Sequence, residues 1–148
     1  ARLISEGKGA LGINLMVAAE YYDDYAHAIN ELDVDVVISG AGLPLELPAL
    51  ITNPKIAIAP IVSSAKAAVL LCKRWLSRHN RLPDFIVIEG PEAGGHLGFD
   101  PEALRTKTAQ KLEEIVVETK EALTNLGHKI HSTGCERCTN GYPFHRNI

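Results

Sequence analysis

The stretch that decides the fold is Pro83–Asp100, which has the sequence PDFIVIEGPEAGGHLGFD. Its apolar, β-branched run Phe85–Ile88 predicts a strand that is buried on both faces. Glu89 stands where that strand ends, and a glycine-rich segment follows whose backbone can approach a ligand closely. One imidazole, His96, lies within this segment. A buried strand followed by a carboxylate, glycines and a histidine is typical of the carboxyl end of a strand in an α/β enzyme.

From the spacing alone, a structural interpretation of this stretch stays open beside the functional one. Glycine-rich loops after strands are common, and a lone histidine is more often a surface or capping residue than a catalyst. The remaining sequence is needed to decide between the two.

Composition narrows the class of protein. The chain has 148 residues, of which 46% are hydrophobic, so it can form one domain with its own core. The net charge is -3 and the charges are interspersed, so nucleic acid is not an expected partner. The apolar runs are too short to cross a membrane and no signal peptide is visible, which predicts a cytoplasmic location. Three cysteines, an odd number, argue against a disulfide scaffold.

Strands and helices are expected to alternate along the chain. Four apolar strands are expected at residues 11–18, 34–38, 55–61 and 85–89, and the first of them is expected to be buried. The segments that follow them, at about 20–32, 45–52, 64–79 and 108–126, show helical spacing of apolar residues or helix-capping signals. We expect Ser63 or Ser64 to cap the third of these helices, Leu76 to lie on its apolar face, and Gly127 to end the fourth. This alternation predicts repeated βα units and a parallel sheet, either doubly wound or part of a (β/α)₈ barrel.

Polar and glycine-rich residues gather at the predicted carboxyl ends of the strands. They are Asn14, Ser39–Gly42, Ser63–Ser64 and Glu89–Gly98. Several strands that contribute to one rim are typical of barrel enzymes, and a complete barrel needs about 250 residues. We therefore expect an α/β fold that forms about half of a (β/α)₈ TIM barrel, with four parallel βα units over residues 1–130. Residues 131–148 are expected to be a divergent tail.

Four blocks of this sequence resemble one known family. The blocks are LGINLMVA at 11–18, VISGAGLP at 37–44, IAPIVSS at 58–64 and EGPEAGGHLG at 89–98. In order and spacing they are similar to the nitronate monooxygenase family, formerly called 2-nitropropane dioxygenase, which includes flavin-dependent enoyl-acyl-carrier-protein reductases. The resemblance covers about residues 8–130.

The resemblance implies a flavoprotein that holds FMN at the carboxyl rim of the barrel. Asn14 and Glu89 match flavin-contacting positions, and Gly94 and Gly95 match the glycine pair on the phosphate and ribityl side. His96 matches the histidine near the reactive face of the flavin, proposed as the base toward a nitroalkane. These residue types suit that chemistry, because glycine amides can bind a phosphate and a histidine can accept a proton near neutral pH. Taken singly, Asn14 is also consistent with a core amide and Glu89 with a structural carboxylate.

The activity implied by the resemblance is the oxidation of alkyl nitronates with O₂ by an FMN-dependent oxidoreductase. Its substrate would be a small nitronate or nitroalkane. The alternative enzyme is the related enoyl-acyl-carrier-protein reductase, which uses NAD(P)H. A third interpretation, of another class, is a non-catalytic half-barrel that self-associates through its open edges.

The chain departs from the family after residue 130. Where the family has a strand of the form IPVIAAGGI, this chain continues with HSTGCERC at 131–138. A truncated or frame-altered chain is the favoured explanation. The other explanation is an appended element in which His131, Cys135, Cys138 and His145 bind zinc, but one Cys-x-x-Cys pair is a weak signal and we expect no metal.

Overall fold

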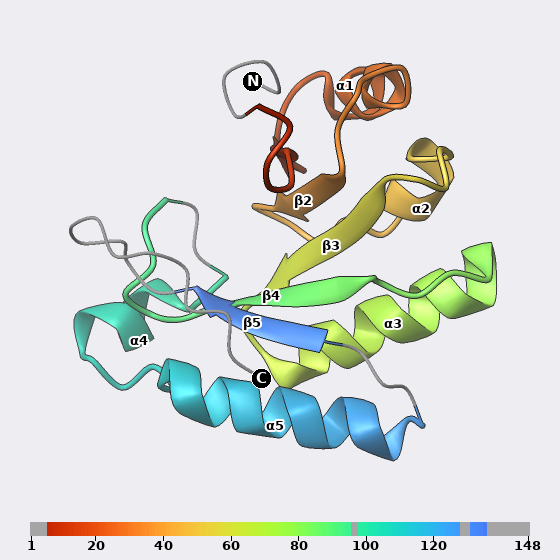
Figure 1. The fold of residues 1–148 in the computed structure, drawn as a ribbon. Helices are drawn as coiled ribbons and strands as arrows, with labels where there is room; N and C mark the ends of the chain where they lie inside the picture. Colours follow the sequence, from red (N-terminus) through yellow and green to blue (C-terminus); the bar gives the residue numbers. More distant parts are fainter. Residues whose placement is uncertain (1–5, 96–97, 128–130, 136–148) are drawn as a thin grey trace.

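The computed structural model describes residues 6–95, 98–127 and 131–135, the last of these as backbone (Figure 1). The elements are β1 (Gly12–Met16), α1 (Tyr22–Ile29), β2 (Val36–Gly40), α2 (Leu47–Leu50), β3 (Ala57–Val62), α3 (Ala65–His79), β4 (Phe85–Glu89), α4 (Pro101–Arg105), α5 (Leu112–Asn125) and β5 (His131–Cys135). The four expected strands and the expected alternation with helices are confirmed.

All five strands form one parallel sheet in the order β1-β2-β3-β4-β5. The order never reverses, whereas a doubly wound sheet has a switch point at which it does. The main helices also follow one another along the sheet, since α1 contacts α2, α2 contacts α3 and α3 contacts α5 (Figure 1). The fold is therefore part of a (β/α)₈ barrel, and the doubly wound alternative is excluded.

The strands are staggered in the way that a barrel requires. β3 pairs with β2 through Ala57–Pro60, but its pairing with β4 is at Ile61 and Val62. Val62, the last residue of β3, is aligned with Ile88, so β4 continues one residue further and ends at Glu89. Such a progressive offset tilts the strands and curves the sheet toward closure.

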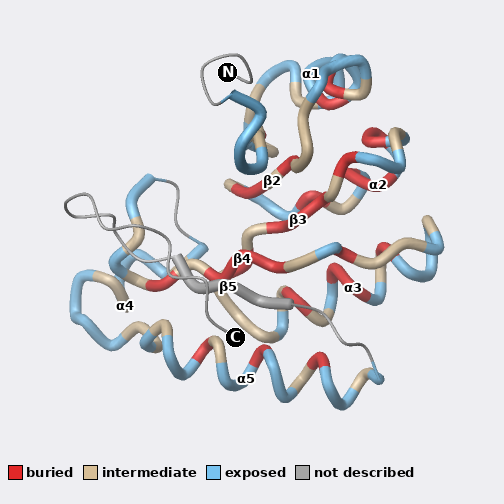
Figure 2. The backbone as a smooth tube through the Cα atoms, viewed as in Figure 1, coloured by how far each residue is buried: buried red, intermediate tan, exposed pale blue. Residues whose placement is uncertain are grey.

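The hydrophobic core lies between the sheet and its helices. Ile58, Ile86 and Ile88 from the strands, together with Leu71 and Trp75 from α3, are each 0% exposed. Figure 2 shows buried residues along β3 and β4 and at intervals along α3 and α5. Burying apolar side chains between the layers is the main stabilising contribution to this fold.

The opposite face of the sheet is partly uncovered, most clearly in β1. Leu15, which faces the helices, is 6% exposed, whereas Met16 is 43% exposed and Asn14 is also exposed. The expectation that the first strand is buried is therefore wrong for this face. The physical reason is that alternate residues of a barrel strand point to the interior, and the described sheet of five strands does not enclose one.

α3 begins at a predicted capping residue, whereas α5 begins at Leu112, four residues after its expected start at about 108. The side chain of Ser64 accepts a hydrogen bond of 3.2 Å from the Ala67 amide at the start of α3, and Asn80 ends that helix with a φ of 49°. Gly127, with a φ of 75°, follows α5. Leu76 has the spacing of the apolar face of α3 but differs from the expectation of burial, because it is 39% exposed.

β5 was not expected from the sequence. It pairs with β4 from Phe85 opposite His131 to Glu89 opposite Cys135, inside the segment expected to be a divergent tail. Its sequence, HSTGC, has no apolar run by which a strand is recognised. Backbone pairing with β4 places it in the sheet, because an open strand edge offers a row of hydrogen-bonding groups.

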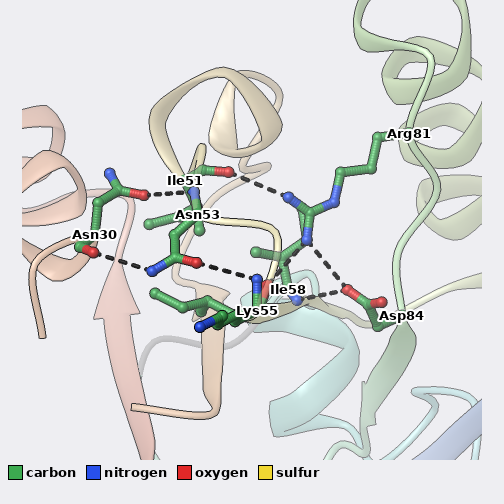
Figure 3. A network of polar contacts seen from close by, with 8 residues as sticks. Asn30, Ile51, Asn53, Lys55, Ile58, Arg81 and Asp84 are labelled. Atoms are coloured by element: carbon green, nitrogen blue, oxygen red, sulfur yellow. Dashed lines mark hydrogen bonds and ion pairs between the residues drawn. The ribbon is translucent and has the colours of Figure 1, made fainter. Parts of the chain in front are cut away.

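A polar network ties together the segments at the amino ends of the strands (Figure 3). The Arg81 guanidinium donates to the carbonyl oxygens of Ile51 at 3.1 Å and Ile56 at 3.0 Å, and it pairs with Asp84. The Asn30 side chain accepts from the amides at positions 52 and 53, at 2.8 and 3.0 Å, and donates to the Leu50 carbonyl at 2.8 Å. These bonds satisfy backbone groups that would otherwise lack partners in the connecting segments.

The same aspartate arrangement occurs twice at this edge of the sheet. Asp35 donates its backbone N–H to the Leu11 carbonyl at 2.8 Å, while its carboxylate accepts from the Leu11 amide at 2.7 Å. Asp84 makes the equivalent pair of bonds to Ile58, at 3.0 and 2.8 Å. The amino edge is therefore held by structural hydrogen bonds, consistent with a role in stability at this end of a barrel.

Candidate functional site

A cavity of about 480 Å³ lies at the carboxyl ends of β2, β3 and β4. It is lined by residues 41–43 after β2, residues 61–64 at the junction of β3 and α3, Ala67, Glu89 and Gly98. This is the rim at which the sequence analysis expected a site. Its volume falls within the range of roughly 300–1,000 Å³ that is usual for small-molecule sites.

Gly98 is held at the cavity by Glu89, the last residue of β4, and by Ser63, which directly follows β3. The Ser63 hydroxyl donates to the Gly98 carbonyl oxygen at 2.8 Å, and the Gly98 amide donates to Oε2 of Glu89 at 3.1 Å. The Glu89 carboxylate therefore accepts a backbone amide, which is the structural role that the sequence left open beside a flavin contact. Gly98 is not predictable as this partner from local sequence, where its position at the end of the glycine-rich segment is the one signal.

The amino end of α3 opens onto the same cavity. Ser64 caps this helix, and both Ser64 and Ala67 line the cavity wall. The first N–H groups of a helix carry a partial positive charge. The expectation that one of the two serines caps the helix is confirmed for Ser64, while Ser63 instead bonds to Gly98.

β2 and β3 pack closely just before the cavity-lining residues 41–43. A Cβ atom on Gly40 would lie 2.9 Å from the Cβ of Ile61, so β2 and β3 approach here only because residue 40 is glycine. Gly42 has a φ of 131°, which also favours glycine. Two residues after Gly42, the carbonyl oxygen of Pro44 accepts a hydrogen bond of 2.9 Å from the indole N–H of Trp75.

The glycine pair that the resemblance assigned to the cofactor lies in the exposed segment after β4. A Cβ atom on Gly94 or Gly95 would meet nothing within 4 Å, and Gly95 has a φ of 92°. Neither glycine lines the cavity. His96, the expected catalytic residue, lies outside the described residues.

Asn14 lies on β1, with β2 and β3 between it and β4. Asn14 is paired with Ile38 on β2 and is exposed on the uncovered face of the sheet. Among the expected site residues, the structure thus places Glu89 in the cavity wall and Asn14 on the open face beyond it.

Ser39 corrects one expectation about the rim. It is 0% exposed and its hydroxyl is 3.0 Å from the Tyr22 hydroxyl of α1, so it faces the helices and does not line the cavity. Burial raises the pKa of Tyr22 above its ordinary value, although the hydrogen bond to Ser39 opposes that shift. Strand alternation explains the difference, because Ser39 has the same parity along β2 as the core residue Val37.

Metal and membrane interpretations find no support in the described part of the chain. No group of three or more His, Cys, Asp or Glu residues within it is placed to hold a metal ion. The side chains of the suggested zinc ligands, His131, Cys135, Cys138 and His145, lie outside the described residues. No helix among residues 6–95 and 98–127 is long and apolar enough to cross a membrane.

A parallel sheet of unreversed order, with a cavity at its carboxyl edge, defines the class as (β/α)₈-barrel proteins with a site at the rim. The solved structures that are similar to it include the following two. FabK from Thermotoga maritima matches with a TM-score of 0.65 and 21% identity, over 88% of this chain and 36% of that one. Nitroalkane oxidase from Streptomyces ansochromogenes matches with a TM-score of 0.61 and 17% identity, over 88% of this chain and 45% of that one.

The chain therefore spans less than half the length of either of these structures. A comparison with curated proteins finds no match. The model of the family described as nitronate monooxygenase matches residues 5–123. The protein belongs to the nitronate monooxygenase family, as the four sequence blocks indicated.

Proposed function

We propose that this chain contributes one side of the flavin site of an FMN-dependent oxidoreductase that oxidises alkyl nitronates with O₂. The observation that carries the proposal is the cavity at the carboxyl ends of β2, β3 and β4, which the glycine-rich segment after β4 adjoins. Membership of the nitronate monooxygenase family supports both the flavin and the substrate class.

Gly94, Gly95 and Asn14 suit a flavin mononucleotide by residue type, although none of them lines the cavity. The open space around Gly94 and Gly95 allows a ligand to approach their backbone amides, which suits a phosphate or ribityl group. Asn14 presents an exposed amide that can both donate to and accept from the edge of the flavin ring. Bound FMN would supply the electron-transfer and oxygen chemistry. His96 is proposed to accept the proton from the carbon next to the nitro group.

The open sheet face indicates that the site needs further protein groups. Within the described residues, the outer edges of β1 and β5 pair with no other strand, and Met16 beside Asn14 is 43% exposed. Water therefore competes for the hydrogen bonds that a closed barrel would protect. We propose that this chain alone binds FMN more weakly than a complete barrel would.

Titration of the purified chain with FMN, followed by visible absorption and fluorescence, tests this proposal. Gly94→Val places a side chain in open space, so it should leave the fold intact while hindering close approach of a ligand. We expect it to weaken FMN binding at least tenfold, and His96→Ala to slow nitronate turnover by about 10²–10⁴-fold. Glu92→Ala, an exposed carboxylate of the same segment, is the matched control. A folded chain that binds no FMN would contradict the proposal.

A second candidate is the flavin-dependent enoyl-acyl-carrier-protein reductase. It is favoured by the similarity in fold to FabK, which has the higher TM-score of the two similar structures compared above. Anaerobic mixing with NADH or NADPH separates the candidates. Rapid bleaching of the flavin absorption by either nucleotide would favour the reductase, and bleaching by a nitronate alone would favour the oxidase chemistry.

The third candidate is a half-barrel that only associates with itself through its open edges. Sedimentation velocity with and without FMN tests it. A discrete monomer with one FMN bound would contradict self-association, whereas concentration-dependent oligomers that bind no flavin would support it.

A further inference from the structure

We propose that Glu89 and Ser63 are positioning residues that hold the glycine-rich segment in place through hydrogen bonds to the backbone N–H and C=O of Gly98. We call these three residues the Gly98 clamp. The clamp itself is independent of any ligand, and its effect on flavin binding rests on the proposed function above.

The clamp joins three separate parts of the rim. Glu89 is the last residue of β4, and Gly98 follows it by nine residues, so their hydrogen bond of 3.1 Å closes a loop that starts at the strand end. Ser63 directly follows β3, and its bond of 2.8 Å fastens the same residue to the neighbouring strand. Because the N–H and the C=O of Gly98 are both engaged, its orientation relative to the sheet is set by two side chains.

Only glycine fits at position 98 with both hydrogen bonds of the clamp in place. A Cβ atom on Gly98 would lie 3.2 Å from the Cβ of Ser63 and 3.7 Å from Oε2 of Glu89, and it would clash with the Ser63 hydroxyl. A side chain at position 98 would therefore have to displace at least one of the two gripping groups. Because residue 98 has no side chain, Ser63 and Glu89 can both reach its backbone.

The loop is also fixed next to the clamp on both sides. After Gly98, Phe99 packs against the hydrophobic core and the Asp100 carboxylate accepts from the Ala103 amide at 3.2 Å, which starts α4. Near the other end, the Ala93 amide donates to the Gly90 carbonyl at 3.1 Å. Gly94 and Gly95, the proposed phosphate-side glycines, thus lie between two tethered ends. Holding backbone donors in place before a ligand arrives reduces the entropy cost of binding.

The role of Glu89 inferred here differs from the one that the resemblance implies. There, the carboxylate contacts the flavin directly, whereas here its Oε2 atom is occupied by the Gly98 amide. A positioning role needs only an oxygen acceptor at this place, and a direct role needs the negative charge at the ligand. Glu89→Gln keeps an oxygen acceptor and removes the charge, so this variant distinguishes the two roles.

Amide hydrogen exchange of the flavin-free chain, followed residue by residue by NMR, tests the clamp. In Glu89→Ala we expect the Gly98 amide to exchange about tenfold faster, because its acceptor is removed. Glu89→Gln should exchange like the wild type, and so should Glu92→Ala, the exposed carboxylate within the same loop. The Val62 amide of β3 reports whether the sheet stays folded. An unchanged Gly98 exchange rate in folded Glu89→Ala would overturn the clamp.

FMN titration of the same variants tests whether the Gly98 clamp strengthens flavin binding. We expect Glu89→Ala and Ser63→Ala each to raise the FMN dissociation constant about tenfold, the double variant to raise it by clearly less than a hundredfold, and Glu89→Gln to restore near wild-type binding. If Glu89→Gln binds as poorly as Glu89→Ala while its Gly98 exchange is normal, the carboxylate acts on the ligand and the positioning role is overturned. If no form binds FMN but exchange responds as expected, the proposed function fails and the clamp stands.

Discussion

The indole N–H of Trp75 donates a buried hydrogen bond of 2.9 Å to the carbonyl oxygen of Pro44. This bond ties the middle of α3 to the segment that follows β2, and residues 41–43 of that segment form part of the cavity wall. The packing of a helix on the outside of the sheet is thereby coupled to the shape of the rim.

Trp75→Phe should lower the free energy of unfolding by about 2–3 kcal/mol, because it leaves a buried carbonyl without a donor and removes side-chain volume. Urea denaturation followed by far-UV circular dichroism measures this, since Trp75 is the single tryptophan and its fluorescence is lost in the variant. Leu70→Ala, on the same helix but 50% exposed, should change stability by at most about 0.5 kcal/mol. A similar loss in both variants would contradict a specific role for the indole.

Arg81→Lys should destabilise the protein by about 2 kcal/mol although the charge is kept. An ammonium group cannot bond to the carbonyls of Ile51 and Ile56 at once with the geometry of the guanidinium fork (Figure 3). Thermal and urea unfolding measure the change, with exposed Arg78→Lys on α3 as the control. Wild-type stability in Arg81→Lys would show that the network contributes little.

Cys72 should resist thiol reagents in the folded protein. It is 1% exposed, and burial raises the pKa of its thiol from 9.0 to about 11. We expect peptide mass mapping to find Cys72 unlabelled by iodoacetamide at pH 8 and labelled once the chain is unfolded in urea. Labelling in the absence of denaturant would show that α3 opens readily.

The raised pKa of Cys72 predicts how the free energy of unfolding depends on pH in the alkaline range. The folded state holds the thiol proton more tightly than the unfolded state, so the contribution of Cys72 is complete below about pH 9 and decreases as the pH rises toward 11. Cys72→Ala should lose this part of the alkaline decrease. An identical pH profile for both proteins, measured by urea unfolding between pH 8 and 11, would exclude the thiol as its source.

Thr119→Val should stabilise the protein by about 1 kcal/mol. Thr119 on α5 is 0% exposed, and its hydroxyl has no hydrogen-bond partner in the described part of the chain, so the variant removes a desolvated polar group at nearly constant volume. Thr124→Val, where an exposed hydroxyl donates to the Lys120 carbonyl at 2.7 Å, is the matched control and should not stabilise. A loss of stability in Thr119→Val would indicate that the hydroxyl has a partner.

Local signals account for the parts of the fold that the sequence predicted well. The apolar run 85–89 corresponds residue for residue to β4, and the expected capping serine lies at the start of α3. These features depend on neighbours within a few residues, so they can be recognised without knowing the fold. β5 and the orientation of Ser39 toward the helices depend on distant partners, β4 and Tyr22, and were missed for that reason.

The candidate site, too, could be predicted from the sequence only in part. The rim location, Glu89 and the glycine-rich segment were predicted from the residues and from the family resemblance, and Glu89 does lie in the cavity wall. The partner of Glu89 was not predicted, because a hydrogen bond to Gly98 depends on the path of the loop and on the position of β3 beside β4.

By itself, the sequence determined the succession of strands and helices, the parallel sheet and the family, because hydrophobic periodicity, capping residues and short motifs are local properties. The tertiary structure decided that the strand order continues without reversal, which face of β1 stays open, and that Ser63 and Glu89 meet at Gly98. Those outcomes depend on long-range packing and on strand register, where a shift of one residue would turn each side chain to the other face of the sheet.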